Sequence, residues 1–296
     1  SVTYDWGDVA GKIWLKENGQ LQIEDQALTP ETILLTSSPW LEQVEASITD
    51  IAPTAASALS IPAPEIATGR ILKDTKADHV LLLFLDAFGY IRYTEALEDG
   101  LIPTLATLDP PQIALTTYPP ITSVSTASLI TGAEPGGHDV ETRGLRKTEK
   151  NTLLDAASQA GLVVKAVEGE ALSFQLRGAD FQLSGDRDGD GGTDDNVLKN
   201  ALTVLEEGMP DLFYVHFHGI DDQGHEVGPG MPAEEEKIRE VDQAVGQILD
   251  RLPPGTLVFI FADHGMHMEK GAERIGNHGH LIERDMLIPI WMLKIN

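Results

Sequence analysis

Short apolar runs alternate with amphipathic stretches from about residue 76 to the end of the chain. Runs of this length are typical of buried strands, and the stretches between them repeat apolar residues at helical spacing. The predicted strands are 79–85, 112–117, 162–167, 211–217, 256–262 and 287–294, and the predicted helices are 92–98, 123–131, 151–160, 195–208 and 233–251. This alternation predicts an α/β fold, with a mostly parallel central sheet covered by helices on both faces.

The N-terminal quarter of the chain lacks this alternation. Residues 13–23 place Asn-Gly between alternating apolar residues, which predicts a β-hairpin with a type I′ turn. Thr29-Pro30-Glu31 resembles a helix start, and the Ala-, Pro- and Ser-rich stretch 52–67 resembles a connector. We therefore expect a small N-terminal appendage over residues 1–75 and a single domain over residues 76–296.

Length and composition narrow the class of protein. A chain of 296 residues with 42% hydrophobic content can bury a large core. No apolar run approaches the roughly 20 residues that span a bilayer. The 47 acidic and 21 basic residues give a formal charge of -26, which disfavours binding to nucleic acid or an anionic membrane. The absence of cysteine excludes disulfides, thiolate metal sites and cysteine nucleophiles.

Aspartate and histidine residues follow several of the predicted strands. They are Asp86 after strand 79–85, Asp221 and His225 after strand 211–217, Asp263 and His264 after strand 256–262, and His278 with His280 before the last strand. Because the carboxyl ends of parallel strands meet at one edge of a sheet, we expect these side chains to converge. Neutral imidazole and ionised carboxylate together suit two closely spaced divalent cations.

A hydroxyl-rich helix start follows strand 112–117. A loop with two prolines leads into Thr122 and Ser123, where free backbone N–H groups and the positive end of the helix dipole favour an alkoxide and a phosphoryl oxygen. Either hydroxyl is a candidate nucleophile, and coordination to a dication would lower its pKa. The alternative is that one of them only caps the helix.

These motifs together resemble the alkaline phosphatase superfamily, specifically its type I phosphodiesterase/nucleotide pyrophosphatase branch. The motifs are Asp86, the Tyr118-Pro119-x-x-Thr122 loop with Thr131-Gly132, Asp221-x-x-Gly224-His225-x-x-Gly228-Pro229, Asp263-His264-Gly265-Met266 and His278-Gly279. The resemblance spans roughly residues 78–294 and implies an alkaline phosphatase-like fold.

The resemblance also implies a ligand set and a mechanism. Asp86, Thr122, Asp263 and His264 would hold one zinc or other divalent cation, and Asp221, His225 and His278 would hold a second. Thr122 would attack the phosphorus of a small phosphate ester, and water would hydrolyse the phosphothreonine intermediate. A sulfatase is not expected, because the Cys/Ser-x-Pro-x-Arg motif is absent.

The sequence departs from the branch pattern in two places. Ser123-Val124-Ser125-Thr126 follows the predicted nucleophile where the branch has Phe-Pro-Asn-His. Arg143 stands in the region where the branch often carries asparagine, and its guanidinium could clamp a terminal phosphoryl group. Because of this second difference, the sequence is compatible with a phosphomonoesterase as well as with a phosphodiesterase. Alternatively, Arg143 forms an ion pair with Glu141 on the surface.

The remaining histidines have structural as well as functional interpretations. His216 and His218 alternate on strand 211–217 and its end, so His218 either reaches the site or is a hydrogen-bonded core residue. His267 and His280 are alternatives to His278 as a ligand of the second metal. His138 is expected to be a loop residue.

A separate acidic loop has calcium-binding spacing. Asp186, Asp188 and Asp190, with Gly191 next, reproduce positions 1, 3, 5 and 6 of a calcium loop. The glutamate expected at position 12 is absent, and Asp194 or Asp195 could replace its oxygens; a solvated acidic turn is the alternative. The absence of cysteine leaves the compartment undecided; the start at Ser1 without Met and the abundance of calcium outside the cytoplasm slightly favour a processed, extracytoplasmic protein.

The sequence therefore favours a two-metal phosphoric-ester hydrolase, with diesters or nucleotide pyrophosphates ahead of monoesters. A phosphotransferase like the cofactor-independent phosphoglycerate mutases is disfavoured, because residues 133–210 are too few for the inserted domain of those enzymes. The alternative that is not an enzyme is a catalytically silent, calcium-organised binding module. The oligomeric state does not follow from the sequence.

Overall fold

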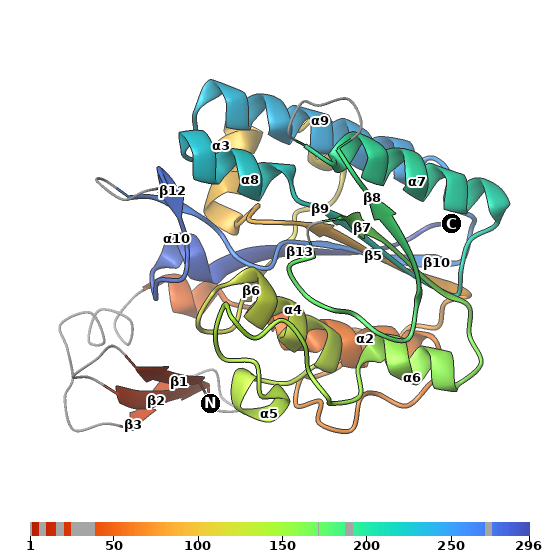
Figure 1. The fold of residues 1–296 in the computed structure, drawn as a ribbon, viewed down its shortest axis with the longest axis horizontal. Helices are drawn as coiled ribbons and strands as arrows, with labels where there is room; N and C mark the ends of the chain where they lie inside the picture. Colours follow the sequence, from red (N-terminus) through yellow and green to blue (C-terminus); the bar gives the residue numbers. More distant parts are fainter. Residues whose placement is uncertain are drawn as a thin grey trace.

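An eight-stranded sheet forms the centre of the computed structural model (Figure 1). The structure describes the backbone of residues 2–5, 10–15, 21–24, 39–170, 172–186, 192–269 and 274–296, with side chains from residue 41 onward. The order of the strands is β4 (Ala46–Ser47), β6 (Gln112–Leu115), β13 (Leu287–Lys294), β10 (Thr256–Phe261), β5 (His79–Leu85), β9 (Leu212–Phe217), β7 (Val164–Gly169) and β8 (Asp180–Ser184). Only β13 runs antiparallel to its neighbours in this sheet, so the prediction of a mostly parallel sheet is confirmed.

The apolar runs of the sequence become the middle strands because both faces of the sheet are covered. β5, β9 and β10 are buried along almost their whole length, as expected of strands between two helical layers. At the edge, β8 leaves Phe181 and Leu183 exposed. The central position of β5 places the residue that follows it, Asp86, in the middle of the carboxyl edge.

Helices cover the two faces of the sheet (Figure 1). One layer contains α3 (Tyr90–Glu98), α7 (Asp194–Glu207), α8 (Gly219–Val227) and α9 (Pro232–Leu249), and the other contains α2 (Ile51–Ala58), α4 (Thr122–Thr131) and α6 (Leu153–Gln159). Every residue of α4 is buried, and the helix ends at Gly132 in the left-handed conformation with φ 68°. This packing fixes the start of α4, where Thr122 lies.

Short elements connect these layers. They are η1 (Pro39–Gln43), η2 (Ile48–Asp50), η3 (Leu105–Thr107), α5 (Pro135–His138), α10 (Glu283–Met286) and the two-stranded sheet of β11 (His267–Met268) and β12 (Gly276–Asn277). A separate three-stranded antiparallel sheet consists of β1 (Val2–Asp5), β2 (Ala10–Leu15) and β3 (Leu21–Glu24). Among the described residues, no helix combines the length and apolar character needed to cross a bilayer.

The N-terminal predictions have mixed outcomes. The antiparallel pairing of β2 with β3 confirms the paired strands of the hairpin, whereas its type I′ turn and the expected helix start near Thr29 lie outside the described residues. The connector predicted over 52–67 is wrong for its first half, because Ile51–Ala58 forms the buried helix α2. The small alanine and serine side chains allow this helix to pack closely against its neighbours. The same residues are typical of connectors, so the composition did not predict a helix. The division at residue 75 stays a prediction, although β4 and α2 join the central sheet and one of its helical layers.

Candidate metal centre

Six of the predicted ligands converge at the carboxyl edge of the sheet in two adjacent groups. Asp86, Asp263 and His264 form one group, and Asp221, His225 and His278 form the other; within each, the potential ligand atoms lie within 4.8 Å of one another. The groups are neighbours, because the rings of His264 and His278 stack with centroids 3.8 Å apart. The structure thus brings together the six side chains, and metal binding by them stays a prediction.

Adjacent parallel strands position the first group. Phe84 of β5 is in register with Phe261 of β10. Asp86 and Asp263 each follow two residues later, so they lie side by side beyond the carboxyl ends of the two strands. Nε2 of His264 lies 3.5 Å from Oδ1 of Asp86 and 3.3 Å from Oδ2 of Asp263. These separations allow one cation to contact all three side chains.

A helix and a small hairpin position the second group. Asp221 and His225 are four residues apart on α8 and therefore share a face of this helix. His278 follows β12, which passes so close to α8 that a Cβ on Gly276 would lie 2.2 Å from the carbonyl oxygen of Gly224. Nε2 of His225 and Nε2 of His278 lie 3.4 Å and 3.6 Å from the two carboxylate oxygens of Asp221.

The hydroxyl of Thr122 faces the first group. Its Oγ1 lies 3.1 Å from Nε2 of His264, and the side chain is at the first position of α4. The helix has no side-chain cap hydrogen bond, so the cap interpretation does not describe Thr122 or Ser123. The hydroxyl of Ser123 is buried and makes no hydrogen bond to the described residues. Of the two predicted nucleophiles, Thr122 is the one in contact with the cluster.

Backbone carbonyl groups set the orientation of the three imidazole rings. Nδ1 of His225 donates to the carbonyl of Gly276 at 2.8 Å, and Nδ1 of His278 donates to that of Pro120 at 2.8 Å. Nδ1 of His264 lies 3.1 Å from the carbonyl of Gly265. A neutral ring that donates through Nδ1 keeps its lone pair on Nε2, and all three Nε2 atoms face the clustered carboxylates.

The unpaired atoms of the cluster fit the cations that the fold implies. Nε2 of His225 and His278, Oδ1 of Asp86 and Asp221, and Oδ2 of Asp263 are buried without a hydrogen-bond partner among the described residues. An unpaired buried polar group costs about 1–3 kcal/mol, so five in one place would be strongly unfavourable. Two divalent cations would satisfy them with the nitrogen and oxygen ligands that such ions prefer.

Burial and mutual charge perturb the titration of the cluster. Burial, together with the charge of Asp86, raises the pKa values of Asp221 and Asp263 well above the usual range. Burial lowers the pKa of His225 to about 4 and also lowers the pKa values of His264 and His278. At neutral pH the histidines are therefore neutral, as metal ligation requires, while bound cations would be needed to keep the carboxylates ionised.

Two further histidines and a glutamate surround Asp86. His216 is fully buried, with Nε2 3.1 Å from Oδ2 of Asp86 and Nδ1 2.9 Å from Oε1 of Glu168. Nδ1 of His218 lies 3.5 Å from the same Asp86 oxygen. Burial alone would raise the pKa of Asp86, but hydrogen bonds from His216 and His218 hold it well below its usual value.

Of the two interpretations of His218, a site residue or a hydrogen-bonded core histidine, the geometry agrees with the first. His216 and Glu168 were not predicted as site residues. A signal existed for Glu168, because it lies at the carboxyl end of β7, the same edge as the other candidates. The remaining histidines lie elsewhere. The ring centroids of His267 and His280 lie 4.7 Å apart, and His138 hydrogen-bonds to Ser128 on the buried helix α4.

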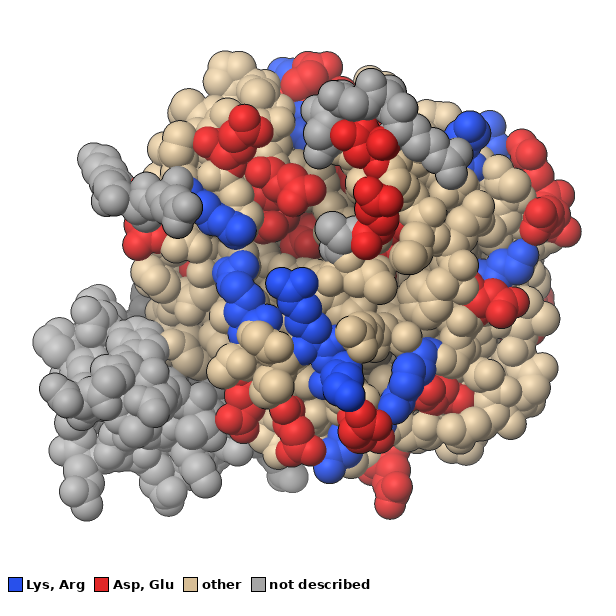
Figure 2. All heavy atoms as spheres, viewed as in Figure 1, with Lys and Arg blue, Asp and Glu red and all other residues tan. Residues whose placement is uncertain are grey.

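Arg143 is the basic residue that is expected to bind the phosphoryl group of the substrate. Its side chain is exposed and interacts electrostatically with Asp221 and Asp86, and Arg274 and Arg146 are close enough to repel it. Desolvation of the guanidinium by nearby protein atoms, together with Arg274, lowers the pKa of Arg143 although the residue as a whole is exposed; Arg143 remains protonated at neutral pH. Figure 2 shows basic side chains gathered across the middle of this face of an otherwise acidic protein.

The calcium prediction remains untested. Asp188 and Asp190 lie outside the described residues, and Asp186 is exposed. Both carboxylate oxygens of Asp194 accept backbone hydrogen bonds at 2.9 Å, one from the N–H of His218 and one from that of Gly219. Asp194 therefore holds the start of α8, a role that competes with calcium ligation.

Solved structures of low sequence identity share this fold. Phosphonoacetate hydrolase from Sinorhizobium meliloti 1021 is similar with a TM-score of 0.51 and 18% identity, covering 70% of this chain and 58% of that one. A 2-O GAG sulfatase is similar with a TM-score of 0.56 and 16% identity, covering 74% and 64%. Residues 170–290 match the family model of type I phosphodiesterase / nucleotide pyrophosphatase, which confirms the resemblance to that branch.

Curated relatives match a shorter part of the chain. GPI ethanolamine phosphate transferase 3, catalytic subunit, of Mus musculus is 34% identical over 86 residues, which are 29% of this chain and 7% of the mouse protein. GPI ethanolamine phosphate transferase 3 of Schizosaccharomyces pombe is 29% identical over 101 residues, 34% of this chain and 10% of that protein. The match thus covers a small fraction of these much longer relatives, whose names describe transferases.

Proposed function

We propose that the protein is a metal-dependent phosphodiesterase that transfers a substituted phosphoryl group from a small phosphate diester to Thr122 and then to water. The observation that carries this proposal is the Thr122 hydroxyl, 3.1 Å from Nε2 of His264 and beside six converging ligand side chains. Asp86, Asp263 and His264, with Thr122, would hold one cation, and Asp221, His225 and His278 would hold the other. Two zinc or other divalent ions, when bound, supply Lewis acidity that lowers the pKa of a hydroxyl and neutralises phosphate charge.

Thr122 acts as the nucleophile in the first half of the reaction. Its Oγ1 forms a bond to phosphorus while the bond from phosphorus to the leaving oxygen breaks, and the leaving alcohol departs after taking up a proton. Thr122 and Ser123 begin α4, where the backbone N–H groups lack intrahelical partners and can donate to a non-bridging phosphoryl oxygen. In the second half, water attacks phosphorus, Oγ1 leaves, and the hydroxyl is regenerated.

Arg143 contributes a cation on the open side of the site. Its interaction with Asp221 and Asp86 supports a position near the reacting phosphate, and a guanidinium can donate two parallel hydrogen bonds to phosphate oxygens. A terminal phosphoryl group offers one more oxygen to this clamp than a diester does. Arg143 is therefore the residue that separates the diesterase from the phosphomonoesterase alternative.

A transferase is the second candidate, because the relatives with 29% to 34% identity are named ethanolamine phosphate transferases. The first half of the reaction would be the same, and an alcohol would replace water as the acceptor in the second. The two functions therefore differ in what reaches the phosphothreonine, not in the residues that form it.

One assay separates these functions. Zinc-loaded protein of measured metal content is given bis-p-nitrophenyl phosphate or p-nitrophenyl phosphate, each with and without a simple alcohol acceptor such as ethanolamine. A phosphodiesterase cleaves the diester faster, with p-nitrophenyl phosphate as the product whether or not the alcohol is present. A new phosphodiester of the alcohol identifies the transferase, faster monoester cleavage identifies the phosphomonoesterase, and no turnover at full zinc content contradicts all three.

A further inference from the structure

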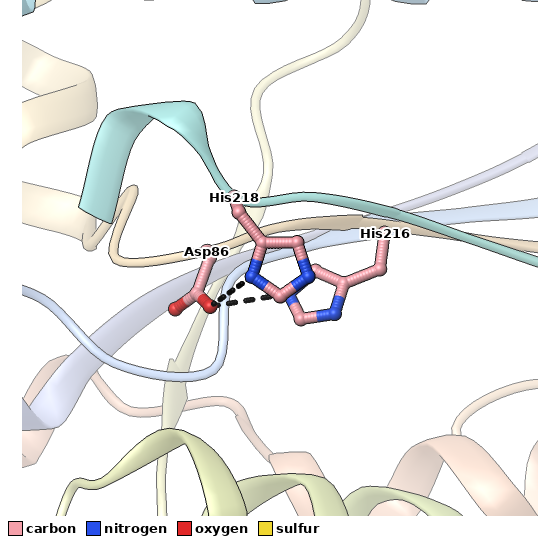
Figure 3. Close-up of side chains that lie close together, drawn as sticks. All are labelled: Asp86, His216 and His218. Atoms are coloured by element: carbon pink, nitrogen blue, oxygen red, sulfur yellow. Dashed lines mark hydrogen bonds and ion pairs between the residues drawn. The ribbon is translucent and has the colours of Figure 1, made fainter. Parts of the chain in front are cut away.

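Asp86 faces two different groups of side chains with its two oxygens. Oδ1 lies 3.5 Å from Nε2 of His264, in the metal centre described above. Oδ2 lies 3.1 Å from Nε2 of His216 and 3.5 Å from Nδ1 of His218. Figure 3 shows the two rings side by side, each directing a nitrogen toward this carboxylate. Potential ligand atoms of these three residues lie within 4.8 Å of one another.

Glu168 closes the other side of the two rings. Its Oε1 lies 2.9 Å from Nδ1 of His216 and 3.5 Å from Nε2 of His218. The rings are 3.7 Å apart between their centroids, and the side chains of Asp86, Glu168 and His216 are 2%, 2% and 0% exposed. Each imidazole therefore lies between two buried carboxylates.

Four contacts join the nitrogens of the two rings to the two carboxylates. A neutral imidazole carries one N–H, so each neutral ring would direct one lone pair at a carboxylate oxygen. A cation beside Asp86 would accept the lone pairs of Nε2 of His216 and Nδ1 of His218, while Nδ1 of His216 donates to Oε1 of Glu168 at 2.9 Å.

The distances from Oδ2 of Asp86 to the two ring nitrogens fit such a cation. Ligand atoms bound tetrahedrally at about 2.0–2.1 Å lie roughly 3.3–3.4 Å apart, and the observed separations from Oδ2 of Asp86 are 3.1 Å and 3.5 Å. Histidines that bind zinc commonly donate their other N–H to a carboxylate, which is the position of Glu168.

We propose that Oδ2 of Asp86, Nε2 of His216 and Nδ1 of His218 bind a third divalent cation of the zinc type, with Glu168 orienting the ring of His216. Asp86 is then shared, with Oδ1 directed to the metal pair and Oδ2 to the third site. This proposal is independent of the reaction that the metal pair performs, since it concerns only where cations bind. Its consequence is that the orientation of Asp86 in the metal centre depends on residues of β9 and β7.

The number of bound ions tests this proposal. Metal-free protein is loaded with excess zinc, unbound ion is removed by gel filtration, and zinc per chain is measured by inductively coupled plasma mass spectrometry. We expect three zinc ions for the unaltered chain and two for His218→Gln. His280→Gln is the matched control, because His280 is an exposed histidine outside the three groups, and it keeps three.

A crystal of the unaltered, zinc-loaded chain locates the ions without any variant. The proposal requires an anomalous peak among Asp86, His216 and His218, and Glu168→Gln should weaken the third zinc by about 10–100-fold. Two peaks at the metal pair and none beside His216 would overturn the third site and leave the proposed function intact. Fewer than two zinc ions in the unaltered chain would overturn the metal pair and the third site together.

Discussion

At the scale of single residues, metal binding by a histidine depends on which ring nitrogen the backbone does not engage in a hydrogen bond. Carbonyl groups engage Nδ1 of His225, His264 and His278, so their Nε2 atoms face the clustered carboxylates. Thr122 adds a hydroxyl to the same place. Motif and position relative to the predicted strands and helices allowed these residues to be predicted. The ring orientations could not be predicted, since they depend on carbonyl groups distant in sequence.

Removing the nucleophile separates catalysis from metal binding. We expect Thr122→Ala to lower kcat by about three orders of magnitude or more on a diester, because the covalent route is lost, while zinc content stays at the level of the unaltered chain. Ser123→Ala is the matched control, since the neighbouring hydroxyl is not in contact with the cluster, and it should retain most activity. Near-normal turnover by Thr122→Ala would move the attacking group to Ser123 or to water.

Arg143 should discriminate between substrates by their charge. Arg143→Ala is expected to reduce kcat/KM by about 10-fold or more on a monoester and by less on a diester, because the guanidinium matches the additional terminal oxygen. Arg70→Ala is the control, because Arg70 pairs with Asp50, away from the metal centre. Equal losses on both substrates would show that Arg143 attracts anions without clamping a terminal phosphoryl group.

Asp263 should have opposite effects on stability with and without metal. Burial, together with Asp86 and Asp221, raises the pKa of Asp263, so the charged form is disfavoured in the folded, metal-free protein. The folded state then binds more protons than the unfolded state, and stability from this group falls as pH rises from the usual carboxyl range toward the folded pKa.

Replacing the carboxyl group should therefore stabilise the metal-free protein at pH 7.5. We expect metal-free Asp263→Asn to have a Tm about 2 °C or more above that of the metal-free unaltered chain. With excess zinc the order should reverse, because the variant lacks a ligand. Melting curves with chelator and with zinc check this, and a lower Tm of the variant in both conditions would contradict it.

At the scale of elements, packing positions the site. Most of the strands and long helices were predicted from apolar periodicity, with bounds that differ by a few residues from the structure. The helix α8, which carries Asp221 and His225, was not predicted, because its glycines and acidic residues obscure the helical pattern. Its start depends on Asp194, a residue that sequence spacing had assigned to calcium.

The cap of α8 can be tested through the ligands that this helix carries. Asp194→Ala removes both acceptors for the N–H groups of His218 and Gly219, and we expect it to cost about 1 kcal/mol of stability. Zinc affinity of the Asp221 group should fall as the start of the helix loosens. Asp195→Ala is the control, because that side chain is exposed. If the two variants bind zinc equally, Asp194 does not position the ligands.

At the scale of the whole molecule, the fold was predictable because both faces of the sheet are covered. Strands that are buried on both faces have unbroken apolar sequences, which are easy to recognise. Because the strands are mostly parallel, their carboxyl ends, and the ligands that follow them, meet at one edge of the sheet. The contribution of residues 46–58 was missed, since β4 contains only two residues and α2 has the composition of a connector. Glu168 was missed although it lies at the carboxyl end of β7, the position that predicted Asp86 after β5.

The central claim is that side chains from β5, α4, α8, β10 and the hairpin of β11 and β12 surround a pair of cations with the hydroxyl of Thr122 beside them. The most direct test is an anomalous difference map, recorded at the zinc edge, from crystals of the zinc-loaded protein. The account predicts one peak bounded by Asp86, Asp263 and His264 with Oγ1 of Thr122 next to it, and one bounded by Asp221, His225 and His278. Absence of either peak, or a Thr122 hydroxyl remote from the first, would contradict it.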